Sequence, residues 1–297
     1  MPLLTVLTAA LVFGAGCARS ARDVSGERIV DDALGVPVHL PGTIERVVTL
    51  APGVTEIVAA AGGVTRLVGV STADDFPETV RTLPRVSALP VNFEAVAALD
   101  PDVVFAAVQV NDVRDRSVFD ELGIPTFYLP SRTLDEVFSS VLQVGELLRT
   151  QTVAEDTVAA LTARTASLRD RTRDMTRPRV LFLISIDQLH SFGPESYVQD
   201  LITIAGGESI TADLNVEVPI LDDEFVLAHR PDIIAGTFNR PFGKEYILAL
   251  HPTWGTLPAI RNNRICTVDG DLILRAGPRN VLGAEKLFKC FHPSPER

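Results

Sequence analysis

The 297-residue sequence is poor in the residue types that make catalytic and metal centres recognisable. It has three cysteines, one tryptophan and five histidines, and no two histidines stand at the helical spacing of a zinc-binding pair. The nucleophile-elbow pattern G-x-S-x-G, the P-loop pattern and the pattern H-E-x-x-H are all absent. We therefore expect neither an enzyme nor a resident cofactor. A bare-metal site stays an alternative, because sequence alone does not show which side chains converge.

Basic residues are also scarce: 27 Lys and Arg stand against 38 Asp and Glu, for a net charge of −11. This balance argues against nucleic acid as a partner, because phosphate backbones are bound by positive surfaces. Acidity by itself does not identify a ligand.

Long apolar runs are missing as well, apart from residues 3–16, which are too short to span a bilayer comfortably. Small residues and then Cys17 follow this run, and Cys17 stands where bacterial lipoproteins carry their lipid. No Lys or Arg precedes the run, so an ordinary cleaved signal is the alternative. We expect a lipoprotein signal at 1–17, a tether at 18–28, and contact with the membrane through the lipid only.

One short pattern occurs twice. Residues 94–104 read EAVAALDPDVV, and residues 224–234 read EFVLAHRPDII. In each copy a glutamate begins a stretch with apolar residues at helical spacing, a proline ends it and a β-branched pair follows, which predicts a short helix leading into a buried strand. Asn92 and Asp222 stand where the N-caps are expected. The repetition predicts two similar lobes, each with a glutamate at the start of an equivalent helix.

Strand and helix patterns alternate on both sides of a helical middle segment. Strands are expected at 46–50, 67–70, 103–106, 125–129, 179–184, 233–235 and 265–268. The alternation predicts α/β architecture, with two similar Rossmann-like lobes that have small, mostly parallel sheets. Residues 152–174 contain neither Gly nor Pro and predict a long rigid helix rather than a flexible hinge. We expect an N-terminal lobe at 29–150, a connecting helix at 151–177 and a C-terminal lobe at 178–297.

In this order and spacing, the motifs resemble the helical-backbone class (class III) of ABC-importer solute-binding proteins, and among them the cobalamin and iron-chelate receptors. The resemblance covers about residues 46–293 and rests on RVVTLAPGVTEIVAAAGG, LVGVSTADDFP, the two repeats and RAGPR at 275–279. It implies a ligand cleft between the lobes, lined by loops that follow the strands. It also implies a monomer outside the cytoplasmic membrane, periplasmic or cell-surface, with an ABC permease and its ATPase subunits as partner.

The resemblance further implies roles for single residues. By position, Glu94 and Glu224 would meet arginines of the permease, although a glutamate in a first helical turn also stabilises the helix dipole by roughly 0.3–1 kcal/mol. Asp271 and Arg275 match an Asp and an Arg that lie near the ligand in the cobalamin receptor. The aromatic residues that surround the corrin there are replaced by Ala73, Leu89, Ala107 and Val218. A planar ring favours aromatic walls, so both a corrinoid and an iron chelate (siderophore) stay open. A haem or bare-metal receptor, or an enzyme or cofactor-handling protein on the same fold, is the alternative.

Polar and aromatic residues that follow the expected strands complete the predicted cleft. They are Asp74, Asp75, Phe76, Gln109, Asn111, Asp187, His190, Phe238 and Arg240, with Arg279 from the RAGPR motif. Turn formation is the alternative role for such loop residues. Three guanidinium groups, on Arg240, Arg275 and Arg279, would suit an anionic ligand, and a structural salt bridge is equally compatible with each. Cys266 and Cys290 could form a disulfide in an export compartment or remain two thiols.

Overall fold

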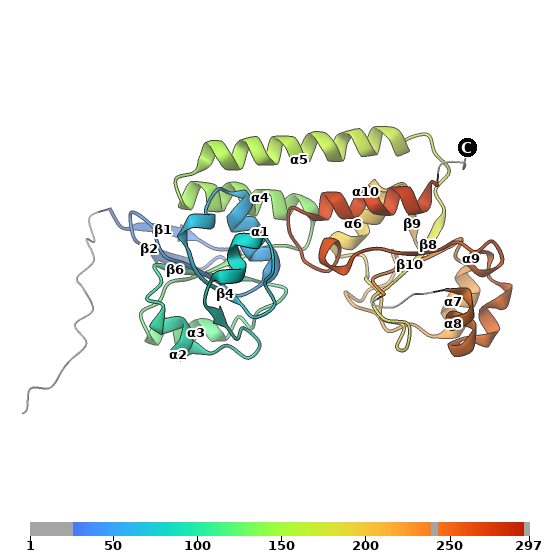
Figure 1. Cartoon of the computed structure of the whole chain (residues 1–297), viewed down its shortest axis with the longest axis horizontal. Coiled ribbons are helices and arrows are strands. Elements are labelled where there is room, and N and C mark those ends of the chain that lie inside the picture. The colour runs from blue at the N-terminus through green and yellow to red at the C-terminus, as the bar shows by residue number, and fades with distance from the viewer. Residues whose placement is uncertain (1–25, 239–242, 294–297) are drawn as a thin grey trace, which may run out of the picture.

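The computed structural model describes residues 26–238 and 243–293, which form two α/β lobes below one long helix (Figure 1). This helix, α5 (Gln151–Thr172), lies where the sequence predicts the connecting helix. Each lobe has its own parallel sheet, so the predicted fold class is confirmed. In the described ranges, no helix has both the length and the apolar character needed to cross a membrane.

The N-terminal lobe is built on a five-stranded sheet with the order β5-β4-β3-β6-β7, in which all neighbours are parallel. Its strands are β3 (Val47–Thr49), β4 (Leu67–Ser71), β5 (Arg85–Val86), β6 (Val103–Ala107) and β7 (Thr126–Leu129). Its helices are α1 (Pro52–Ala60), η1 (Val64–Arg66), η2 (Glu78–Thr82), α2 (Phe93–Ala98), α3 (Asp115–Glu121) and α4 (Leu134–Leu147). A separate antiparallel pair, β1 (Arg28–Asp31) and β2 (Pro37–Leu40), precedes them. All residues of β6 are buried, as expected for a strand that helices cover on both faces.

The C-terminal lobe repeats this plan with a four-stranded parallel sheet of order β11-β10-β8-β9. Its strands are β8 (Arg179–Leu183), β9 (Glu208–Ser209), β10 (Ile233–Gly236) and β11 (Ile265–Thr267). Its helices are α6 (Tyr197–Ile204), α7 (Asp223–His229), α8 (Lys244–Leu250), η3 (Pro252–Thr256), α9 (Pro258–Arg261), η4 (Gly270–Leu272) and α10 (Asn280–Phe291). Of the two alternatives for its cysteines, the structure has the disulfide, which joins Cys266 in β11 to Cys290 in α10.

The repeated sequence pattern forms the same helix in both lobes. The side chain of Asn92 accepts a hydrogen bond from the Ala95 amide at 3.0 Å, and that of Asp222 accepts one from the Phe225 amide at 2.7 Å. Residues 92–100 and 222–230 alternate between buried, half-buried and exposed positions in the same order. Both helices are followed by a residue in the left-handed region, Asp100 with φ 46° and Arg230 with φ 45°. The shared pattern therefore determines capping, burial and the turn that follows.

An aspartate in each copy then ties the helix to the neighbouring strand. The Asp102 carboxylate accepts hydrogen bonds from the amides of Glu45 and Arg46, each at 2.8 Å, just before β3. The Asp232 carboxylate accepts one from the amide of Arg179 at 2.9 Å, at the start of β8. In each lobe, the aspartate of the repeat thus holds the start of its own strand beside the start of the neighbouring strand in the sheet.

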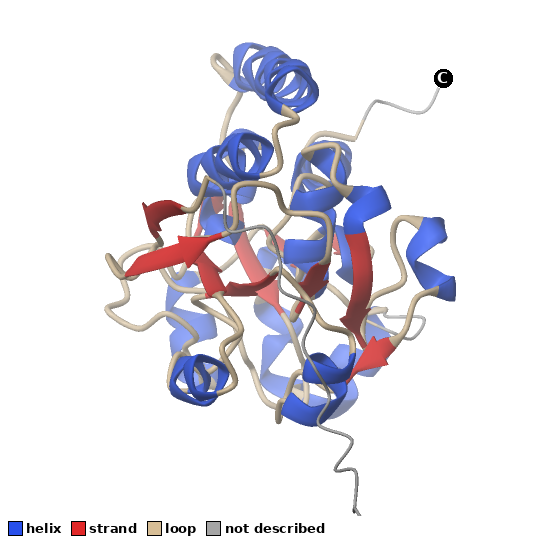
Figure 2. Cartoon of the chain, turned by 90° about the vertical axis from the view of Figure 1, so that its left-hand side faces the viewer, coloured by secondary structure: helices blue, strands red, loops and turns tan. Residues whose placement is uncertain are grey.

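Both ends of α5 rest on matching turns, one in each lobe. The Thr150 hydroxyl donates to the Ala61 carbonyl at 2.5 Å, and the Thr172 hydroxyl donates to the Ile204 carbonyl at 3.3 Å. The glycines that follow α1 and α6 have positive φ values, +84° at Gly62 and +78° at Gly206. A Cβ at either position would press against α5. The 22 residues of α5 span about 33 Å at the α-helical rise. Figure 2, an end view from the N-terminal lobe, shows α5 outside the helices that cover the sheets.

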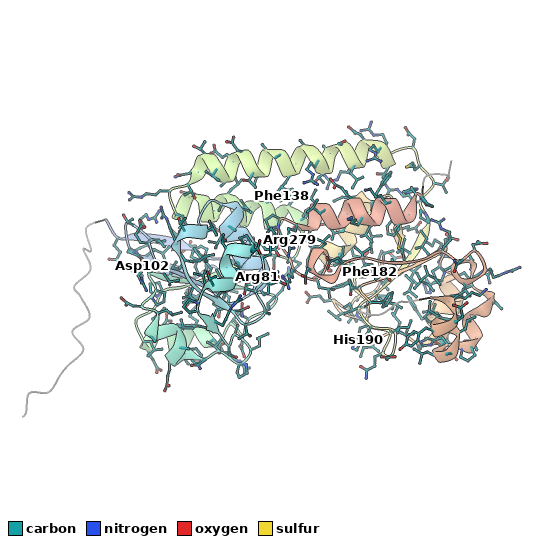
Figure 3. All side chains as sticks on the ribbon, viewed as in Figure 1. Arg81, Asp102, Phe138, Phe182, His190 and Arg279 are labelled. Carbon is teal, nitrogen blue, oxygen red and sulfur yellow. A yellow bond between two sulfur atoms is a disulfide. The ribbon has the colours of Figure 1, made fainter. Side chains whose placement is uncertain are left out.

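A continuous hydrophobic cluster also joins the lobes beneath α5. It extends from Phe105 and Phe127 in the N-terminal sheet through Phe138 on α4 to Phe182 on β8 and Phe291 on α10. Figure 3 labels Phe138 and Phe182 on their respective lobes. Because this cluster excludes water from the junction, the lobes are held together by burial as well as by α5.

Candidate functional site

A pocket of about 180 Å³ lies between the two lobes. Its N-terminal wall follows β6 and β7, and its C-terminal wall comes from the segments before α6, before α7 and before α10. The lining residues are Gln109, Val110, Ser131, Arg132, Phe192, Glu195, Ser196, Tyr197, Glu217, Val218, Leu274 and Ala276. The carboxyl ends of parallel strands thus contribute to the cleft, which is where open α/β sheets bind ligands.

Two neutral hydrogen-bonding side chains face this pocket. The Gln109 side-chain oxygen accepts from the amide and the hydroxyl of Ser131, at 3.1 and 3.0 Å, so its orientation is fixed. Among the described residues the Gln109 amide nitrogen has no hydrogen-bond partner, which leaves it as a donor toward the pocket. Tyr197 begins α6, and burial raises the pKa of its phenol above the usual value. The phenol therefore stays protonated at neutral pH.

Apolar side chains make up much of the remaining wall. Phe192 and Tyr197 are half-buried there, whereas Val110, Val218 and Leu274 are more exposed toward the pocket. Val218 is one of the four positions at which the resemblance implies an aromatic residue. The pocket volume is below the 300–1,000 Å³ typical of sites for drug-sized ligands. A larger ligand would therefore require the lobes to separate or would extend beyond the cleft.

Two of the arginines predicted to line the cleft form ion pairs between the lobes, and their contact with a ligand stays a prediction. Arg275 forms ion pairs with Asp75 of the N-terminal lobe and with Asp271, the latter at 2.9 Å. The Arg279 guanidinium donates to Glu56 on α1 at 2.6 Å. Both arginines lie between η4 and α10, in residues 271–279, which we call the crossing segment. Figure 3 labels Arg279 at the junction of the lobes.

The ring of Phe76 covers this junction, with the Arg279 guanidinium carbon 4.1 Å from its centroid. The third predicted arginine, Arg240, lies outside the described residues.

The two cross-lobe carboxylates have opposite electrostatic environments. The Glu56 side chain is only 2% exposed, and burial raises its pKa although the Arg279 hydrogen bond opposes this effect. The Arg275 hydrogen bond lowers the pKa of Asp75, whose side chain is 44% exposed. Desolvation thus dominates the pKa of Glu56 in the inner pair, Glu56–Arg279. Attraction to the guanidinium dominates the pKa of Asp75 in the outer pair, Asp75–Arg275.

Asp74 and Asn111, both predicted to line the cleft, are buried and bond to their own lobe. The Asp74 carboxylate accepts from the Ser71 hydroxyl, and burial raises the pKa of Asp74. The Asn111 side chain donates to the Leu50 carbonyl and accepts from the Ala107 amide, each at 3.0 Å. These contacts hold the loops that follow β4 and β6. Ligand contact by either residue stays a prediction.

Three predicted residues of the C-terminal lobe, Asp187, His190 and Phe238, are not among those that line the pocket. Asp187 is exposed, and its carboxylate accepts from the Tyr246 hydroxyl at 3.4 Å. His190 has its Nδ1 3.0 Å from the Gln188 carbonyl, and Phe238 packs against the apolar cluster around Trp254. Among the predicted residues that the structure describes, Gln109 is the one that lines the pocket.

Several lining residues were not predicted. Ser131 and Arg132 lie in the loop after β7, so the rule that loops after strands line the cleft applies to them as it does to Gln109. Glu195 and Tyr197 precede or begin α6, and Glu217 belongs to the irregular segment before α7. No periodic pattern places Glu217 beside the cleft, because it becomes a neighbour of the N-terminal lobe only through tertiary packing.

Glu94 and Glu224 occupy equivalent places on the two lobes. Each lies in the first turn of its helix and is exposed. Within the part of the chain that the structure describes, neither side chain forms a hydrogen bond or an ion pair. Figure 1 shows α2 and α7 on the side of their lobes that faces away from α5. The two helices that carry these exposed glutamates therefore lie on the same side of the molecule.

Metal coordination receives no support from the described residues. Among residues 26–238 and 243–293, no three His, Cys, Asp or Glu side chains come together in a group that could hold an ion. The described cleft instead offers amide, phenol, guanidinium and carboxylate groups around apolar walls.

Known proteins resemble this chain along most of its length. An uncharacterized ABC transporter substrate-binding lipoprotein, YvrC of Bacillus subtilis, is 24% identical and aligns with 97% of this chain and 95% of its own. The vitamin B12-binding protein of Salmonella typhimurium is 30% identical over 86% of this chain and 92% of its own. The solved structure of the periplasmic heme-binding protein RhuT from Roseiflexus sp. RS-1 is 27% identical, covers 84% of this chain and 98% of its own, and superposes with a TM-score of 0.74.

The family model described as periplasmic binding protein matches residues 47–272. The matched range extends from β3 of the N-terminal lobe to η4 of the C-terminal lobe, and so includes both repeats, α5 and most of the residues that line the cleft. This chain therefore belongs to the periplasmic binding protein family.

Proposed function

We propose that this protein is the extracytoplasmic substrate-binding component of an ABC importer. It binds a corrinoid or an iron chelate between its lobes and carries out no chemical step. The observation that carries this proposal is the paired presentation of Glu94 and Glu224 by structurally equivalent helices on the same side of the molecule. The names of the relatives support it, since they describe a transporter substrate-binding lipoprotein, a vitamin B12-binding protein and a heme-binding protein.

The permease is the partner that would use these two carboxylates. Arginines on its outer face would pair with Glu94 on one lobe and Glu224 on the other. An exposed ion pair contributes little by itself, but a pair desolvated in an interface gives orientation and a faster encounter. Because α5 and the buried cluster fix the spacing of the lobes, the two contacts would form together only when the cleft faces the permease.

The location follows from the same role. The name of the family, periplasmic binding protein, supports a location outside the cytoplasmic membrane, and YvrC is described as a lipoprotein. Lipidation of Cys17, which lies outside the described residues, would keep the receptor near its permease. Replacement of Cys17 by Ser is expected to release the protein from membranes in a fractionation experiment without changing ligand affinity.

The proposal is tested by replacing both glutamates with lysine. E94K/E224K is expected to abolish uptake of the imported ligand while its dissociation constant stays within about twofold, because neither residue lines the pocket. Each single variant should retain partial uptake. The measurements are uptake of labelled ligand in cells and ligand titration of the purified protein.

A matched control is available elsewhere on the molecule. Glu155 on α5 and Glu208 on β9 are exposed acids on elements other than α2 and α7, so E155K/E208K changes the charge equally. This control is expected to leave uptake unchanged. Normal uptake by E94K/E224K, or equal loss in both double variants, would refute docking through these two residues.

Haem is a second candidate ligand, favoured by the TM-score of 0.74 with the heme-binding protein RhuT and by the phenol of Tyr197 in the cleft. Absorbance spectra of the purified protein with haemin and with cyanocobalamin distinguish the two, because each ligand has its own visible spectrum when bound.

A further inference from the structure

The arginines that would attract an anionic ligand are already neutralised within the protein. Arg275 is paired with Asp75 and Asp271, and Arg279 is paired with Glu56. Both guanidinium groups are largely covered, with 17% of each side chain exposed. Because three carboxylates surround two guanidinium groups, the crossing segment offers no excess positive charge to a ligand.

The pocket itself has more acidic than basic side chains. Arg132 of the N-terminal lobe is the basic lining residue, and Glu195 and Glu217 on the opposite wall are the acidic ones. All three are exposed. A concave site with low-dielectric walls concentrates the field of its lining charges, and the chain around it has a net charge of −11. The described cleft is therefore unfavourable to an anion.

The neutral groups in the cleft suit a ligand with carbonyl oxygens. The amide nitrogen of Gln109 and the phenol of Tyr197 are hydrogen-bond donors on opposite walls. The apolar side chains of Phe192, Val218 and Leu274 lie near them and can bury a hydrocarbon body.

We propose that this cleft selects a neutral or cationic chelate with an apolar body and peripheral carbonyl oxygens, and disfavours an anionic chelate. Three hydroxamates balance the charge of ferric iron, whereas three catecholates leave the complex strongly negative. A corrinoid with amide side chains or a trihydroxamate iron complex thus fits, while a tris-catecholate iron complex or a porphyrin dicarboxylate does not. This inference rests on the proposed receptor function and narrows its ligand class.

The test compares four probes with the purified full-length protein by isothermal titration at low ionic strength. The neutral and cationic probes are cyanocobalamin and the ferric complex of desferrioxamine B; the anionic probes are haemin and ferric enterobactin. One of the first two is expected to bind at least about tenfold more tightly than either anionic probe. An anionic probe that binds as tightly or more tightly overturns the charge selectivity and leaves the receptor function standing. Failure of all four to bind counts against the receptor function itself.

A charge-reversed cleft gives a second readout. E195K/E217K is expected to improve binding of the anionic probes about tenfold or more, and the improvement should shrink as salt is added because salt screens exposed charges. E155K/E208K changes the net charge equally outside the cleft and is expected to leave the ranking of the probes unchanged. The single variant E217Q, which only removes a charge, should shift the ranking in the same direction by less. An unchanged ranking in folded E195K/E217K, or an equal shift in the control, overturns the assignment.

Discussion

The two lobes are alike where the chain repeats itself and differ where it does not. The helices that present Glu94 and Glu224 have the same capping, burial order and closing turn. The C-terminal lobe has the disulfide, and its residues 271–279 form ion pairs with the other lobe. A local pattern thus accounts for the shared surface, whereas the cleft depends on contacts between the lobes that the repeat does not encode.

The equivalent helices are also supported by different packing. In the N-terminal lobe, Phe93 packs edge-to-face on Phe119 with ring centroids 5.0 Å apart. In the C-terminal lobe, the Asp223 carboxylate lies 2.6 Å from Nδ1 of His251 and accepts from Nε1 of Trp254 at 3.0 Å. Each lobe therefore presents an exposed glutamate on an equivalent helix. That helix is held by an aromatic contact in the N-terminal lobe and by polar contacts in the C-terminal lobe.

Removal of the disulfide is expected to weaken the C-terminal lobe most. Cys266 and Cys290 are separated by 24 positions, for which loss of the cross-link lowers the free energy of unfolding by about 3.5 kcal/mol through the unfolded chain's entropy. In C266S/C290S, amide hydrogen exchange should accelerate in β11 and α10 more than in β6. Equal acceleration in both lobes would show that they unfold as one unit.

The aspartates that follow the repeats give a matched comparison of stability. Asp102 accepts two backbone hydrogen bonds and Asp232 accepts one. D102A is expected to lower the free energy of unfolding by about 3 kcal/mol and D232A by about 1.5 kcal/mol, since each hydrogen bond to a charged group contributes at least about 1.5 kcal/mol. Urea denaturation of both variants measures the difference. A larger loss in D232A would contradict the idea that the number of hydrogen bonds decides it.

The repeat and the strand alternation were sufficient to predict the two lobes. Proline, asparagine and aspartate act on their immediate neighbours, so helix starts at Asn92 and Asp222 were predictable from spacing. The long helix was also predictable, because the absence of Gly and Pro over residues 152–174 is a local property. The lobe boundaries at 29–150 and 178–297 stay a prediction.

The partners of the arginines could not be predicted in the same way. Arg275 and Asp75 lie 200 positions apart, and Arg279 and Glu56 lie 223 apart. No local pattern encodes such a pairing, because it forms only when the crossing segment reaches the other lobe. Gln109 was predicted to line the cleft because it follows a strand, whereas Glu217 belongs to a segment without periodicity.

The Glu56–Arg279 and Asp75–Arg275 pairs should change the free energy of unfolding with pH in opposite directions. The pKa of Glu56 is raised above its ordinary 4.5, so above pH 4.5 the unfolded chain loses this proton before the folded protein does. The free energy of unfolding therefore falls as pH rises from 4.5 to the folded pKa. The pKa of Asp75 is lowered below 3.8, so its stabilising contribution is complete above 3.8 and is lost as pH falls through the folded pKa.

Isosteric variants separate these two contributions, which are the smallest effects expected here because each arises from one carboxyl group. E56Q should remove the decline above pH 4.5, and D75N should remove the loss below pH 3.8, each relative to wild type. Urea denaturation of the three proteins across this pH range gives the slopes. If E56Q and wild type had the same slope of unfolding free energy against pH, the Arg279 hydrogen bond would offset the effect of burial on the pKa of Glu56 fully. Attraction would then weigh as much in the Glu56–Arg279 pair as in the Asp75–Arg275 pair.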